Sequence, residues 1–375
     1  TEWLAADGAL DRAAMAAAFP ASSSKDLSTG NLHGGGEDGV APKPTTIAEF
    51  LATWPREEPR YFKDWHLRRD GGGAFYATPR GFEPDWLGAW LGALGEDDFD
   101  FCYVGRAGTR TPPHVDVLAT YSWSVNVCGR KRWWLRRASP ETDDTFDDDD
   151  DASDADTLFD AAEDPSRVVI IDQGPGDAIF VPSGWPHRVL NLEDCVSINR
   201  NWFNAATADR VVAYLLRRRR DVLAELDDCK ADVLLRRAQD DGPSSDDDSD
   251  AGGPAEWRWT CERVLQANSR LNLSNFVALV AFNAVDDRPR PLIPGTSADQ
   301  DRDLRARLVA LLDHVRAVAE DALFLVDVDI DTHPAVVLDE APPHRTTRPL
   351  RLLRFPTDDE PASWSREARR RALDA

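Results

Sequence analysis

The chain has 375 residues, a formal net charge of −23 and a sequence pI near 4.7. This acidity argues against a surface that wraps nucleic acid or an anionic membrane, because both are negatively charged. No apolar run approaches the roughly 18 residues that a membrane-spanning helix needs. The five cysteines are an odd number without CxxC spacing, which favours a reducing compartment, so we expect a cytoplasmic or nuclear location.

The length suits one large domain with an appendage. The patterns divide the chain into a flexible N-terminal segment (1–44), a β-barrel domain (45–204), a helical region (205–325) and an unassigned Pro- and Arg-rich tail (326–375). Within the first segment, the Ala-rich residues 1–20 predict a short helix, and residues 21–44 read as linker. An acidic insertion is expected over 141–165, where ten carboxylates fall between Glu141 and Asp156. Such charge runs are usually solvated.

Helical patterns lie on both sides of the barrel segment. Thr46 to Glu49 is a capping-box pattern that opens a short amphipathic helix over 47–54, and another helix is expected near 84–94. Beyond Asn204, apolar residues recur at helix spacing. The predicted helices of this region cover 211–226, 254–268, 273–285 and 297–315.

From Phe99 the pattern changes to short segments rich in Val, Ile, Phe and Trp, separated by Gly and Pro turns. These segments are 99–105, 114–137, 167–174, 176–182, 187–191 and 195–203. Such strands indicate a β-sandwich or small barrel instead of a βαβ sheet. The predicted fold is therefore a mainly β core with N-terminal helices and a C-terminal helical region.

Two stretches of the predicted barrel carry the residues for a metal site. The first reads GTRTPPHVD (108–116) and holds His114 and Asp116, whose spacing places both side chains on one face of a strand. The second reads GDAIFVPSGWPHRVLN (176–191) and contributes His187. Two imidazoles and one carboxylate form the facial triad of non-heme Fe(II) sites. The alternative is a structural histidine pair in a barrel that binds no metal.

The spacing of both stretches resembles the two cupin motifs, with Gly108, His114 and Asp116 in the first and Gly176, Pro182, Gly184, His187 and Asn191 in the second. Cupin-like proteins have a double-stranded β-helix. Three longer segments, YFKDWHL, YSWSVNVCGRKRWW and FVPSGW-x-H-x-V-x-NLED-x-x-SIN-x-NW, extend the similarity. Over residues 55–285 the chain resembles JmjC-domain 2-oxoglutarate oxygenases, in particular the jumonji domain-containing protein 4 subfamily.

The resemblance implies that Fe(II), 2-oxoglutarate and O₂ are used at His114, Asp116 and His187. Relatives place a lysine at the position of Lys131 to bind the distal carboxylate of 2-oxoglutarate, although GRKR could also be a solvated hairpin tip. The resemblance implies co-substrate contacts for Thr111, Asn199 and Ser124 as well. Thr111 could equally be a turn former beside Pro112. Asn199 lies on a strand with one polar face, which lines a cavity if it points inward and is ordinary surface otherwise.

The resemblance also implies a function. Members of the subfamily hydroxylate a lysine of the translation release factor, so the expected activity is Fe(II)- and 2-oxoglutarate-dependent lysyl hydroxylation with a protein as substrate. A JmjC demethylase, or a hydroxylase of another protein side chain, would use the same centre. A non-catalytic binding module that kept the fold is a third alternative, against which the complete triad and Lys131 argue. Neither nucleic acid nor a membrane is an expected partner.

Overall fold

The computed structural model describes residues 3–19, 23–24, 27–29, 45–54, 60–70, 76–93, 99–137, 159, 167–229, 252–284, 291–319, 326–329 and 335–338. The chain divides into two compact units. One contains residues 1–82 and 97–202, and the other contains residues 83–96 and 203–375. The predicted division assigned all of 45–204 to the barrel, but residues 83–96 cluster with the C-terminal helices. Most of the predicted acidic insertion, 141–165, lies outside the described residues.

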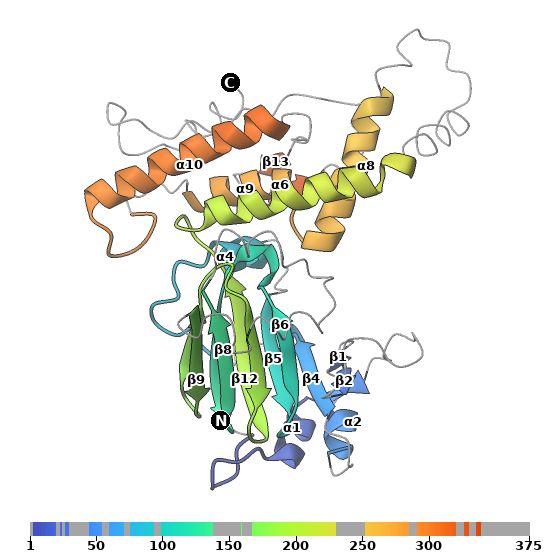
Figure 1. Ribbon diagram of the computed structural model, residues 1–375, viewed down its shortest axis with the longest axis vertical. Helices are drawn as coiled ribbons and strands as arrows, with labels where there is room; N and C mark the ends of the chain where they lie inside the picture. The colour runs from blue at the N-terminus through green and yellow to red at the C-terminus, as the bar shows by residue number, and fades with distance from the viewer. Residues whose placement is uncertain are drawn as a thin grey trace. The chain divides into compact units, whose positions relative to one another are not determined.

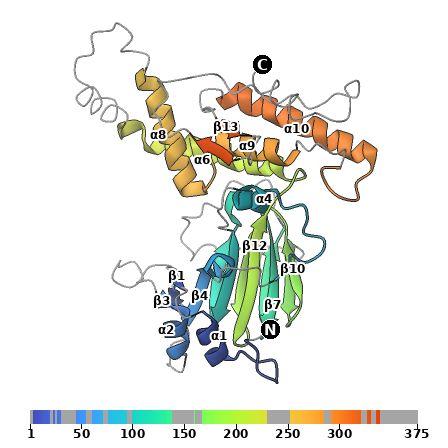
Figure 2. The same cartoon turned by 180° about the vertical axis from the view of Figure 1, so that it is seen from behind.

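The first unit is built on two antiparallel sheets (Figures 1 and 2). The larger sheet has the order β10-β7-β12-β5-β4-β2 and the smaller has the order β6-β11-β8-β9. The strands of the two sheets are β2 (Leu27–Thr29), β4 (Arg60–Trp65), β5 (Asp100–Gly105), β6 (Arg110–His114), β7 (Tyr121–Cys128), β8 (Lys131–Arg136), β9 (Val168–Gln173), β10 (Ala178–Val181), β11 (His187–Asn191) and β12 (Cys195–Trp202). Consecutive strands such as β7 and β8 belong to different sheets, as in a double-stranded β-helix. The predicted cupin-like fold is confirmed.

The N-terminal residues are part of this unit and not wholly the flexible segment that we predicted over 1–44. A short helix does form, α1 (Arg12–Ala18), with Asp11 as its N-cap. Trp3, Met15 and Phe19 are buried in a core cluster with strand residues such as Phe62 and with α2 (Ile47–Ala52). Burial of these large apolar side chains stabilises the folded segment, although its helix pattern in the sequence is weak. A further two-stranded pairing joins β1 (Ser23–Ser24) to β3 (Thr45–Thr46).

Helix α2 begins as the sequence predicts. The Thr46 side chain accepts from the backbone of Glu49, and the Glu49 carboxylate accepts from the backbone of Thr46. This reciprocal capping box satisfies two amide groups that the first turn of a helix leaves without partners. The short elements α3 (Leu67–Asp70) and η1 (Val117–Ala119) complete the first unit.

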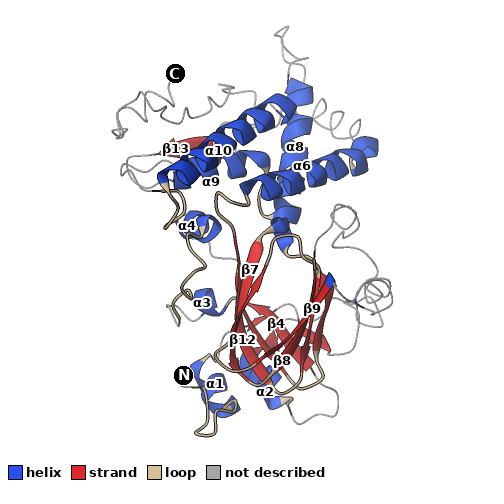
Figure 3. Cartoon of the chain, turned by 60° about the vertical axis from the view of Figure 1, so that its left-hand side comes forward, coloured by secondary structure: helices blue, strands red, loops and turns tan. Residues whose placement is uncertain are grey.

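The second unit is mainly helical (Figure 3). Its elements are α4 (Trp86–Ala93), α6 (Ala208–Glu225), η4 (Asp227–Cys229), α8 (Gly252–Ser269), α9 (Leu273–Ala284), α10 (Ala298–Ala319), β13 (Val326–Asp329) and β14 (Ala335–Leu338). A buried ion pair joins Arg219 of α6 to Glu262 of α8, with 2.8 Å between Nε and Oε1. Among the helices that the structure describes, none combines the length and apolar character needed to cross a membrane.

Gly129 forms the turn between β7 and β8 and has a φ of +74°. A Cβ at this position would lie 2.1 Å from the carbonyl oxygen of Asp194. We therefore expect Gly129→Ala to lower the free energy of unfolding by more than about 2 kcal/mol, because backbone strain is added to a steric clash. Urea denaturation of both proteins measures this difference. Gly176→Ala is the control, since Gly176 has a similar φ of +83° but open space around its Cβ position. An equal loss in both variants would contradict the role of the clash.

Candidate metal centre

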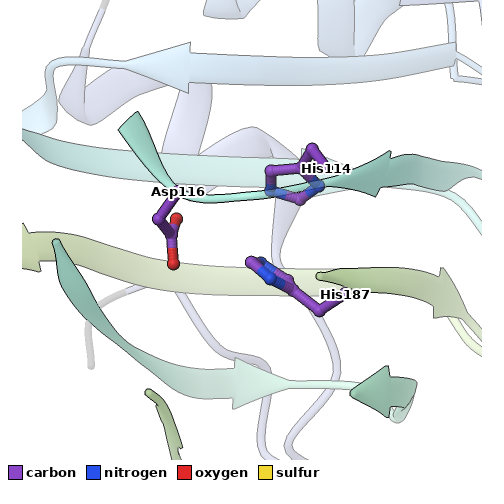
Figure 4. A group of neighbouring side chains, drawn as sticks. All are labelled: His114, Asp116 and His187. Atoms are coloured by element: carbon purple, nitrogen blue, oxygen red, sulfur yellow. The ribbon is translucent and has the colours of Figure 1, made fainter. Parts of the chain in front are cut away.

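The three predicted ligands meet between two paired strands of the smaller sheet. His114 is the last residue of β6, His187 is the first residue of β11, and the two are directly paired in the ladder. Asp116 follows β6 at the N-cap of η1. One potential ligand atom from each of the three residues lies within 4.8 Å of the others. Figure 4 shows the side chains turned toward a common space, so one ion can be held by all three.

Backbone hydrogen bonds fix the orientation of both imidazoles. Nδ1 of His114 lies 2.9 Å from the carbonyl oxygen of Pro112, and Nδ1 of His187 lies 3.0 Å from that of Trp185. Because a carbonyl only accepts, each Nδ1 carries the proton and each Nε2 has a free lone pair. This is the tautomer in which a neutral histidine binds a metal through Nε2.

Protonation of His114 does not compete with metal binding at neutral pH. Burial and the neighbouring His187 lower the pKa of His114 to about 4, although Asp116 acts in the opposite direction. The two rings lie with their centroids 4.2 Å apart, a distance at which two imidazolium charges would repel strongly. Two neutral nitrogens and one carboxylate oxygen suit Fe(II) and similar divalent metals, and three protein ligands leave coordination positions open.

The Asp116 carboxylate is held by residues that the sequence analysis did not identify. The hydroxyl of Ser122 donates to Oδ2 at 2.7 Å, and Nδ2 of Asn201 donates to Oδ1 at 3.0 Å. The same Nδ2 donates to Oγ1 of Thr120 at 3.1 Å. Ser122 and Asn201 are paired residues of β7 and β12, so the larger sheet fixes the carboxylate at a site formed by the smaller sheet.

We expect Ser122→Ala and Asn201→Ala each to weaken Co(II) binding by about tenfold. Each substitution removes a hydrogen bond that orients the Asp116 carboxylate, so metal binding must then also bear the entropy cost of ordering this side chain. Isothermal titration of the metal-free protein with Co(II) measures this affinity. Asn283→Ala is the control, since Asn283 donates only to backbone carbonyls in the second unit. Unchanged affinity in both test variants would show that these hydrogen bonds have no role in metal binding.

Asn199 and Ser124 occupy the next step of the same polar ladder. They are cross-strand partners, and the Ser124 hydroxyl donates to Oδ1 of Asn199 at 2.7 Å. Ser197, one step further, is fully buried and receives a hydrogen bond from Lys131. The polar face of β12 therefore points into the barrel, which is one of the two alternatives that the sequence left open. Co-substrate contacts of Asn199 and Ser124 stay a prediction.

Lys131 lies inside the barrel and not at a solvated hairpin tip. It is 2% exposed, and its Nζ donates to Oγ of Ser197 at 2.7 Å and lies 6.0 Å from the ring centroid of Tyr61. In the part of the chain that the structure describes, no carboxylate forms an ion pair with it. A buried ammonium without a negative partner is costly. The arrangement suits an anion that binds in the cavity.

The fourth predicted co-substrate residue, Thr111, faces the same side as His114 because of a β-bulge. Thr111 pairs with Val189 and His114 pairs with His187, so three steps of β6 correspond to two steps of β11. The bulge contains Pro112 and Pro113, which have no N–H to donate to the ladder. The structure thus brings Thr111 to the ligand face, and its contact with a co-substrate stays a prediction.

Comparison with known proteins agrees with this geometry. Residues 101–202 match the family described as "JmjC domain, hydroxylase", and this range contains the three candidate ligands and Lys131. The two sheets and the His-Asp-His cluster identify this part of the chain as a JmjC domain.

The relatives define the type of JmjC domain more closely. The "2-oxoglutarate and iron-dependent oxygenase JMJD4" of Gallus gallus is 32% identical over 242 residues, which are 60% of this chain and 51% of the relative. The zebrafish (Danio rerio) protein of the same name is 39% identical over 165 residues, 41% of this chain and 39% of the relative. The "Arginine-specific demethylase JMJ20" of Arabidopsis thaliana is 33% identical over 262 residues, 62% of this chain and 51% of the relative. The chain thus contains a segment that matches the JmjC domain and is similar to these JMJD4 oxygenases, and its matches span about half of the relatives or less.

Proposed function

We propose that this chain is an Fe(II)- and 2-oxoglutarate-dependent protein hydroxylase whose substrate is a lysine of a translation release factor. The observation that carries the cofactor assignment is the buried, carboxylate-free Lys131 in the same barrel as a two-histidine, one-carboxylate cluster. The names of the JMJD4 relatives support iron and 2-oxoglutarate. The release factor rests on the resemblance to the subfamily. Such a substrate agrees with a cytoplasmic location, a nuclear location or both.

His114, Asp116 and His187 would hold the iron. When bound, the iron and 2-oxoglutarate supply O₂ activation, with 2-oxoglutarate converted to succinate and CO₂ as one oxygen atom enters a substrate C–H bond. The chain's own residues bind the two groups, orient the C–H bond and exclude water. A divalent ion with one carboxylate and two neutral imidazoles has a net charge of about +1, which attracts an anionic chelator.

Lys131 supplies the second positive charge for this anion. Asn191, the β11 residue that pairs with Lys131, lies four residues beyond His187 on the same face of the strand. At about 3.3 Å per residue, the two backbone positions are about 13 Å apart. The side chain of Lys131 and the five-carbon 2-oxoglutarate, placed end to end, are together long enough to cover this distance. One end of 2-oxoglutarate then faces the metal ligands, and the other end faces Nζ of Lys131.

The experiment that tests this function is mass spectrometry of overlapping release-factor peptides incubated with the protein, Fe(II), 2-oxoglutarate and O₂. We expect one peptide to gain a single oxygen atom on an unmethylated lysine, together with formation of succinate. Reactions without 2-oxoglutarate are the control. Succinate formation with no modified peptide would retain the oxygenase and remove the release factor as substrate.

Demethylation is the second candidate, and a specific observation favours it. Arabidopsis relatives are named an arginine-specific demethylase, 33% identical over 262 residues, and a lysine-specific demethylase, 31% identical over 142 residues. Hydroxylation of an N-methyl group releases formaldehyde, so a methylated peptide would lose the mass of a methylene group. Incubation of methylated and unmethylated versions of one peptide distinguishes the two reactions.

A further inference from the structure

A β-bulge in β4 places two charged residues opposite one tyrosine of β5. Phe62 pairs with Val104 and Trp65 pairs with Cys102, so Lys63 and Asp64 together oppose Tyr103. Asp64 has a φ of +51°, a left-handed conformation that is uncommon for residues other than glycine and more frequent for Asp and Asn. Bulges redirect side chains and are over-represented beside active sites. This one separates Asp64 from the regular alternation of the strand.

The bulge faces the interior of the barrel. Tyr103 pairs with Ser197, the residue that receives the hydrogen bond from Lys131, so both belong to the inward face of the larger sheet. The Tyr103 hydroxyl donates to Oδ1 of Asp64 at 2.6 Å. The Asp64 carboxylate is thereby fixed at the end of an inward-facing side chain.

Tyr103 is a neutral donor to Asp64. Burial, followed by the carboxylates of Asp64 and Asp116, raises the pKa of Tyr103 well above its ordinary value. The Tyr103 hydroxyl therefore keeps its proton and orients the Asp64 carboxylate through their hydrogen bond.

Asp64 has no cation as partner among the residues that the structure describes, and its only hydrogen bond there is the one from Tyr103 to Oδ1. Its second oxygen, Oδ2, is thus available to a donor that enters the barrel. The proposed centre carries positive charge from the metal and from Lys131, which would repel an incoming ammonium or guanidinium. A carboxylate at the bulge offsets that repulsion at one position.

We propose that Asp64, oriented by Tyr103, binds the cationic end of the substrate side chain and is the residue that selects a positively charged substrate. This inference rests on the proposed function, since it concerns the same barrel. A hydrogen-bonded ion pair to a carboxylate adds direction as well as affinity, so the cation would fix which C–H bond lies near the metal.

The experiment compares two small probes on the Mn(II)-loaded protein with 2-oxoglutarate bound. Nα-acetyl-lysine N-methylamide carries the ammonium, and Nα-acetyl-norleucine N-methylamide has the same carbon chain without it. Paramagnetic broadening of the probe's side-chain proton signals by Mn(II) reports both the affinity and the proximity to the metal. We expect Asp64→Asn to reduce the affinity ratio of the lysine probe to the norleucine probe by about tenfold.

Asp64→Asn retains a carbonyl oxygen that can accept from Tyr103, so the bulge is expected to stay folded. Tyr103→Phe is the second variant. It leaves the Asp64 carboxylate in place but removes the hydrogen bond that orients it, so we expect the same affinity ratio to fall by about threefold. Asp172→Asn is the matched control, because it removes one negative charge from an exposed position that pairs with Arg132. That substitution should leave the ratio unchanged.

A wild-type protein that binds Mn(II) but treats the two probes alike would overturn the inference and leave the proposed function intact. An unchanged ratio in Asp64→Asn would also overturn it. If the wild-type protein binds no Mn(II) and forms no succinate, the proposed function itself fails. Loss of the ratio in Asp64→Asn, with normal Mn(II) binding, supports the assignment of Asp64.

Discussion

Replacement of His114 or Asp116 by Ala is expected to reduce 2-oxoglutarate turnover to below about 1% of the wild-type rate. Each substitution removes one of only three protein ligands, and the remaining two cannot hold the ion in the same geometry. Succinate formation with saturating Fe(II) and 2-oxoglutarate measures the effect. Thermal unfolding of the metal-free variants should stay near that of the wild type, because both side chains are only half-buried and belong to no described core cluster.

The controls for this result are His314→Ala and Asp172→Ala, which remove the same side chains from exposed positions on α10 and β9. Both should retain wild-type turnover. Turnover that persists in His114→Ala or Asp116→Ala would mean that the cluster is not the centre of the reaction.

Replacement of Lys131 by Met is expected to raise the KM for 2-oxoglutarate by between about tenfold and a hundredfold. Met has a similar volume but cannot donate to the distal carboxylate, so the loss falls on the binding of the co-substrate. The variant without ligands should be at least as stable as the wild type, because a buried ammonium without a carboxylate partner is removed. Steady-state kinetics and thermal unfolding together measure these two effects.

Arg132→Met is the matched control for Lys131→Met. Arg132 is the next residue of β8, but it is exposed and pairs with Asp172 on the outer side of the sheet, at 2.6 Å between Nε and Oδ1. Its replacement should leave the KM unchanged. An unchanged KM in Lys131→Met would show that this lysine does not bind 2-oxoglutarate.

The sequence predicted the cluster of His114, Asp116 and His187 because its residue types and spacing are rare together. His114 and Asp116 stand two apart in the chain, and His187 follows a Gly- and Pro-containing turn that resembles the second cupin motif. The barrel strands were visible as short segments rich in Val, Ile, Phe and Trp between Gly and Pro turns, and the helices were visible from a capping box and from helix spacing. These are local signals, so a single sequence is enough to find them.

The remaining features depend on pairing between distant segments. Asn201 touches Asp116 across 85 residues of chain, and nothing in the sequence distinguishes it from Asn199, which was singled out instead. The bulge that redirects Asp64 exists only relative to β5. Lys131 is likewise buried because β11 and β9 pair with β8 on its two sides. The sequence around Lys131 does not show this pairing and is also compatible with an exposed turn.

The most direct measurement is a crystal structure determined without oxygen in the presence of Mn(II) and 2-oxoglutarate. We predict one Mn(II) bound by Nε2 of His114, Nε2 of His187 and a carboxylate oxygen of Asp116. The keto acid end of 2-oxoglutarate should coordinate this ion, and the distal carboxylate should lie within hydrogen-bond distance of Nζ of Lys131. An ion held by other residues, or a co-substrate that leaves Lys131 without a negative partner, would contradict the account.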